Sequence, residues 1–122
     1  MDFAKDDLLA TVEIGSLAIG SAAVAFPRLS ARIAGADPDA GANTATARAL
    51  GFWSTAYGAL LQFADSEDER ERLLMAGAAV GSAYCVNMLA AAARKRVTWR
   101  GALTHVASVG VITAAACLYL SD

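Results

Sequence analysis

The sequence predicts an all-α protein, a bundle of four transmembrane helices in a single domain that covers residues 1–122. Apolar residues make up 57% of the chain and charged residues only 18%, whereas a soluble domain normally has about 25% charged residues. The charges fall in short clusters, and the apolar stretches between them approach the ~20 residues that cross a bilayer. None of these stretches shows the polar stripe that a helix of a soluble bundle presents to water.

The first helix is expected over about 7–26. Glu13 is its one charged residue after the first turn, and Pro27 ends it because proline cannot continue a helix. The second helix is expected over about 45–64, with Arg48 near its start. In the long connection before it, Gly35 to Asp39 is turn-forming sequence, and residues 28–33 suit a short amphipathic turn at the membrane interface.

The third helix is expected over about 67–94. Ser66 and Glu69 form the sequence pattern of an N-cap with a capping box. A charge-free stretch follows, and Arg94-Lys95-Arg96 provides cations suited to a helix C-terminus. The fourth helix is expected over about 99–120, with Thr98 as its N-cap and His105 inside it.

The distribution of positive charge predicts an orientation in the cell membrane. Four crossings put both termini and the connection near residue 66 on one side, with three of the ten cations. The other two connections have seven, and the excess of Lys and Arg marks the cytoplasmic side. We therefore expect a multi-pass protein with both termini outside the cytoplasm. A net charge of −2 gives no basic surface for nucleic acid.

Small residues in the third helix predict close helix packing. Gly77 and Gly81 form a GxxxG motif inside an apolar span, and Ser16 with Gly20 is a weaker version. Packing within the bundle is the preferred interpretation, and association into a homo-oligomer through Gly77 and Gly81 is the alternative.

Polar residues at membrane depth are candidates for function. Counting ~1.5 Å per residue, Glu13 and Gln62 form an outer layer, and Arg48, Asn87 and His105 form an inner one. The two layers lie roughly 15–20 Å apart, which argues against a direct acid–base pair between Glu13 and His105. Tyr57 and Tyr84 are expected near mid-membrane, with Trp53 beside the inner layer.

These residues support two interpretations. In the structural one, Asn87 bonds between helices, His105 reaches the interface and Trp53 packs against lipid. In the functional one, a lipophilic small molecule binds there. Its ligand-binding residues are Arg48, Trp53, Asn87 and Gln62, and its candidate catalytic residues are His105, Glu13, Tyr57 and Tyr84. A lone histidine without a second ligand at suitable spacing predicts no metal site, and no cofactor is expected.

Several short motifs carry a family resemblance. They are Phe26-Pro27-Arg28, Ile33-Ala34-Gly35, and the run from Arg48 to Trp53 followed by Gly58. With them, most of the chain resembles the small four-helix bacterial membrane proteins of the DUF4267 type, a largely uncharacterised family. The resemblance implies the four-helix membrane fold. The chain departs from the pattern at Trp53, where members commonly have a second arginine. It also departs from it after Gly81, at Ser82 and Cys85, where members often have aspartates.

Three functions remain open from the sequence. The first is an accessory or self-associating membrane subunit that also binds a lipophilic ligand. The second is a cofactor-independent isomerase or cyclase that acts on a lipophilic substrate. The third is a small proton-coupled transporter that uses Glu13. An internal cavity that reaches His105 or Glu13 would favour a ligand site over a purely structural role.

Overall fold

The computed structural model describes residues 4–121, and all regular elements in this range are helices. They are α1 (Lys5–Ala25), α2 (Pro27–Ile33), α3 (Gly41–Gln62), α4 (Glu67–Ala93) and α5 (Trp99–Ser121). The all-α prediction is confirmed for these residues; residues 1–3 and 122 of the expected domain lie outside them. Four long helices are present, but α2 is a fifth helix where only a turn is expected. Pro27 starts α2 at a position where its missing N–H is not needed.

Three of the helices, α1, α4 and α5, are long and apolar enough to cross a membrane. This is consistent with a membrane protein. The fourth long helix, α3, is not among them, because polar side chains such as Asn43, Thr46 and Arg48 interrupt its apolar sequence.

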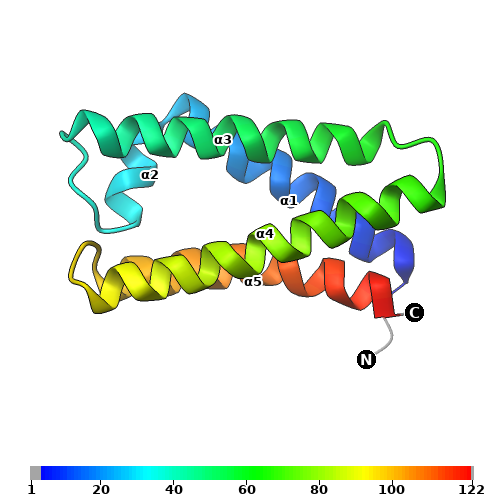
Figure 1. Ribbon diagram of the computed structural model, residues 1–122. Coiled ribbons are helices and arrows are strands. Elements are labelled where there is room, and N and C mark those ends of the chain that lie inside the picture. Colours follow the sequence, from blue (N-terminus) through cyan, green and yellow to red (C-terminus); the bar gives the residue numbers. More distant parts are fainter. Residues whose placement is uncertain (1–3, 122) are drawn as a thin grey trace.

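The four long helices form two pairs (Figure 1). α3 runs along α1, α4 runs along α5, and contact between α1 and α5 joins the pairs. α3 and α4 make few contacts, and they diverge from the connection at 63–66 that joins them (Figure 1). We call the end with this connection and both chain termini the terminal end. The opposite end, with α2 and the connections at 34–40 and 94–98, is the loop end.

Glycines bring α1 and α3 into backbone contact. A Cβ atom on Gly51 would lie 2.7 Å from the carbonyl oxygen of Gly20, and one on Gly20 would lie 2.7 Å from that of Gly51. Ser54 Oγ donates a hydrogen bond of 2.9 Å to the carbonyl oxygen of Ser16 in the same seam. Any larger residue at either glycine would push the two helices apart.

Side-chain caps start α4 and α5 where the sequence predicts them. The backbone N–H of Glu69 donates to Ser66 Oγ at 3.2 Å, and that of Gly101 donates to Thr98 Oγ1 at 3.0 Å. The contact made by Glu69 differs from that of a standard capping box in one detail. The Glu69 carboxylate accepts from the N–H of Asp65 at 3.1 Å, one residue before the N-cap position.

Two left-handed residues end helices at the loop end. Lys95 follows α4 with φ 59°, and Gly35 follows α2 with φ 73°. The N–H of Arg96 donates to the carbonyl oxygen of Ala91 at 2.9 Å, the hydrogen bond of a Schellman motif. Lys95 adopts this conformation despite having a Cβ atom, which disfavours it relative to glycine.

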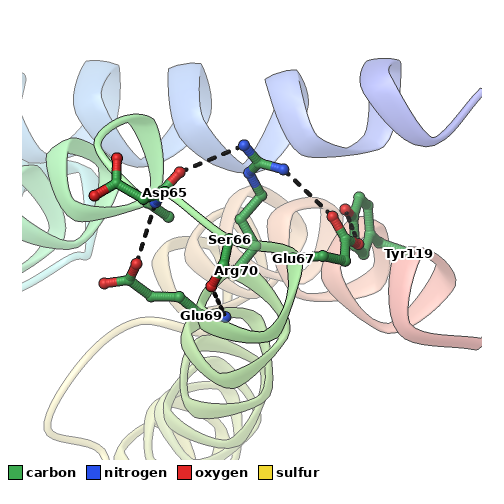
Figure 2. A network of polar contacts seen from close by, with 7 residues as sticks. Asp65, Ser66, Glu67, Glu69, Arg70 and Tyr119 are labelled. Carbon is green, nitrogen blue, oxygen red and sulfur yellow. Dashed lines mark hydrogen bonds and ion pairs between the residues drawn. The ribbon is translucent and has the colours of Figure 1, made fainter.

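The terminal end is closed by both apolar and polar contacts. Buried side chains from all four long helices, among them Val12, Leu61 and Leu74, form its core. Above them, Tyr119 donates a hydrogen bond of 2.5 Å to Glu67, and Arg70 forms an ion pair of 3.3 Å with Glu67 (Figure 2). These contacts hold the start of α4 against the last turn of α5.

Candidate functional site

A cavity of about 380 Å³ lies between the two helix pairs, on the side where α3 and α4 diverge. Residues of all five helices line it. Its inner wall comes from α1 and α5, including the buried Ser16 and Gly20. Its size falls in the range of about 300–1,000 Å³ that is usual for small-molecule sites.

The end of the cavity nearest the loop end is polar. The Tyr84 hydroxyl and His105 Nδ1 are 2.8 Å apart, and the imidazole also faces the backbone of Ser30 in α2. Asn87, one turn of α4 beyond Tyr84, lines the same end. Whether Tyr84 or His105 donates in their hydrogen bond depends on which imidazole nitrogen carries the proton.

The middle of the cavity is mainly apolar. Ile112 and Val109 face it from α5, Leu50 and Trp53 from α3, and Val80 from α4. Because these residues lie nearer the terminal end than His105 and Asn87 do, the cavity has a polar end and an apolar body.

Tyr57 closes the narrow end of the cavity, near the α3–α4 connection. Its hydroxyl donates a hydrogen bond of 3.0 Å to the carbonyl oxygen of Leu73 and lies directly over Gly77. Gly81 is covered in the same way by the Thr113 side chain of α5. Both glycines of the GxxxG motif therefore face side chains of their own chain.

Five of the residues singled out from the sequence line this one cavity. Tyr57 and Tyr84 do not meet, because Tyr57 lies over Gly77 and Tyr84 is seven residues further along α4, or about 10 Å. The five are Trp53, Tyr57, Tyr84, Asn87 and His105.

The other three candidates, Glu13, Arg48 and Gln62, are not among the lining residues. Glu13 is half-buried in α1, whereas Arg48 and Gln62 are exposed on α3. Within residues 4–121, no hydrogen bond joins Glu13 to Gln62. The inner polar layer therefore reaches the cavity through Asn87 and His105 and not through Arg48.

Sequence reasoning missed six polar residues that line the cavity. Ser16, Ser54 and Thr113 belong to α1, α3 and α5, and the other three are Ser30, Asn43 and Thr46. These last three lie in or beside the segment that was expected to connect helices. A signal for two of them exists, since Asn43, Thr46, Leu50 and Trp53 follow the three- and four-residue spacing of one helix face. Extending α3 back to Gly41 places them on the cavity side.

The polar end has the chemistry to bind and polarise a hydroxyl, carbonyl or amide group. Asn87 offers two donors and an acceptor, and the Tyr84–His105 pair can donate or accept a proton. Within the described residues, no group of three His, Cys, Asp or Glu side chains is placed to hold a metal ion.

A scan of protein-family models and searches of the curated proteins and of the solved structures found no match to this chain. The resemblance to proteins of the DUF4267 type stays a prediction from the motifs quoted above.

Proposed function

We propose that this chain is an integral membrane protein that binds a lipophilic, amphiphilic small molecule in the cavity between α3 and α4. The observation that carries the proposal is the cavity of about 380 Å³, with the side chains of Tyr84, Asn87 and His105 converging at one end. An apolar pocket with a few converging polar groups is the usual form of a small-molecule site. The ligand head lies against Tyr84, Asn87 and His105, and its apolar body lies against Trp53 and Ile112.

In this proposal α3 crosses the bilayer together with the three more apolar helices. Its 22 residues span about 33 Å, enough for the hydrocarbon core, and its polar side chains Asn43 and Thr46 point into the cavity. The loop end, with seven of the ten cations, lies in the cytoplasm, and both termini lie outside. With Cys85 and Cys117 replaced by serine, a Lys95→Cys variant should react with a membrane-impermeant thiol reagent only after the cytoplasmic face is opened. Reaction in intact cells would reverse the orientation.

Tryptophan fluorescence can test ligand binding directly. In a Trp99→Phe background Trp53 is the remaining tryptophan, so a long-chain alcohol brominated in its chain should quench it saturably in lipid nanodiscs. Val109→Phe fills the cavity and should weaken saturable quenching about tenfold, the effect of losing about 1.4 kcal/mol. Val111→Phe, on the exposed face of α5, is the matched control and should leave the saturable quenching unchanged.

Equal quenching in the Val109→Phe and Val111→Phe proteins would mean that the alcohol only dissolves in lipid, and the proposal would then be wrong. Val80→Phe at the cavity edge, with Val86→Phe as its control on the exposed face of α4, gives a second comparison if Val109→Phe impairs folding.

The Tyr84–His105 hydrogen bond favours a second candidate, a cofactor-independent isomerase that moves a proton on the bound ligand. Such an enzyme should exchange hydrogen for deuterium next to the carbonyl of a long-chain ketone. His105→Gln and Tyr84→Phe should abolish this exchange while quenching of Trp53 by a brominated ketone persists. Exchange at the same rate in both variants and in wild type would remove this candidate.

Two other roles have less support from the geometry. A self-associating subunit that uses Gly77 and Gly81 would need these glycines to be uncovered, yet Tyr57 and Thr113 cover them. A transporter that uses Glu13 would need this carboxyl group in the cavity wall, and Glu13 is not one of the lining residues.

A further inference from the structure

The described residues of the cavity wall carry no fixed charge, and we infer from this that the ligand is an amphiphile with an uncharged head group, such as an alcohol, a ketone or an amide. The inference rests on the proposed function and narrows its ligand class. Among the described residues that line the cavity there is no Asp, Glu, Lys or Arg.

The location of the charges explains why the cavity should select uncharged head groups over ions. The chain has ten cations and twelve acids, but those in the described residues lie at the two ends of the bundle or outside the cavity wall, as Glu13 and Arg48 do. An ion moved into an apolar cavity loses its hydration, and it binds only where an opposite charge or several hydrogen bonds compensate. With the imidazole of His105 neutral, the donors and acceptors of Tyr84, Asn87 and His105 compensate for an uncharged polar head but not for an ion.

Three probes that share one brominated alkyl chain test this inference in the Trp99→Phe protein. Their heads are a hydroxyl, a sulfate and a trimethylammonium group, and each is titrated as a mole fraction of nanodisc lipid. We expect the alcohol to bind about a hundredfold more tightly than either ion, as the cost of a charge at membrane depth implies. Val109→Phe should weaken only the binding of the alcohol.

The outcomes separate the inference from the proposed function. If a charged probe binds as tightly as the alcohol and both lose affinity in Val109→Phe, the cavity is a ligand site but its ligand is not neutral. If no probe responds to Val109→Phe, the proposed function fails and this inference fails with it.

A different observation, the exposure of the cavity edges, indicates how the ligand enters. Trp53 and Leu50 on α3 are 63% and 44% exposed, and Val80 on α4 is 48% exposed, although all three line the cavity. Deeper positions on the same helices, Gly51 and Gly81, are buried. The cavity therefore opens sideways between two apolar edges, and we propose that the ligand enters from the lipid through this slot.

Thiol labelling tests the route independently of ligand affinity. With Cys85 and Cys117 replaced by serine, Val109→Cys should react with a lipid-soluble alkyl maleimide and not with a charged, water-soluble thiosulfonate. Val111→Cys on the lipid face should behave in the same way, and Arg96→Cys at the loop end should react with both. Preferential labelling of Val109→Cys by the charged reagent would place the entrance on the water side and overturn the proposed route.

Discussion

The two long faces of α3 contrast in what they contact. Toward α1 the helix presents Gly51, Gly58 and Ser54, and the two backbones come together. Toward α4 it presents Leu50, Trp53 and Tyr57, and there the helices diverge around a cavity. Small residues let helices approach closely in a membrane, where apolar burial adds little to association. We call the contact between α3 and α1 the closed seam, and we call the side of α3 that faces α4 the open side.

The comparison indicates that the cavity depends on contacts between helices elsewhere in the bundle. α1 and α5 pack together behind it, and the core at the terminal end fixes the point from which α3 and α4 diverge. Changes at the closed seam should therefore affect stability, whereas changes at the open side should affect ligand binding.

The largest stability effect is expected from Gly51→Leu, which breaks the closed seam. Its Cβ atom would collide with the backbone of Gly20, and overpacking of this kind costs about 1–3 kcal/mol. Gly110→Leu is the matched control, since nothing lies within 4 Å of a Cβ atom at Gly110. Unfolding by SDS titration in micelles measures both, and equal stability of the two variants would contradict the importance of the seam.

A smaller effect is expected from Ser66→Ala, at the point where α3 and α4 begin to diverge. The substitution removes the oxygen that caps α4 through the N–H of Glu69, and loss of an N-cap costs about 1 kcal/mol. Ser108→Ala, on the exposed surface of α5, should be close to neutral. Hydrogen exchange of the first turn of α4 should increase in the Ser66 variant alone; unchanged exchange there would show that the cap is not important.

The smallest effect is expected from Tyr57→Phe, at the narrow end of the open side. The phenyl ring keeps its place over Gly77, and only the hydrogen bond to the carbonyl oxygen of Leu73 is lost. Hydrogen bonds within membrane proteins contribute about 0.6 kcal/mol on average. A loss several times larger in the same SDS titration would mean that this bond, and not the core at the terminal end, holds α3 against α4.

Local signals in the sequence identify most of the fold. Pro27, Ser66 and Thr98 mark helix boundaries that the structure also has. The additional helix α2 was not predicted, because a seven-residue helix has too few turns to show a clear period. The sequence itself shows that α3 is less apolar than the other long helices. It does not show that Asn43 and Thr46 line the cavity whereas Arg48 is exposed.

The candidate site could be predicted only in part. Asn87 and His105 can be identified as polar residues within the expected membrane spans, and Trp53, Tyr57 and Tyr84 as aromatic ones. All five line the cavity. Counting depth along a helix does not give its rotation, so Arg48 was grouped with His105 although it faces outward. The cavity itself arises from the divergence of α3 and α4, a property of helix packing that no single motif encodes.

If the ligand enters through the sideways opening between α3 and α4, as proposed, the bilayer is the solvent from which the site is filled. The quantity that sets occupancy is then the number of ligand molecules per lipid molecule, and not their concentration in water. Half-saturation expressed as a mole fraction of lipid should stay constant when the amount of lipid is doubled, whereas the apparent constant calculated from total sample volume should double. Occupancy would thus report how much neutral amphiphile the membrane holds.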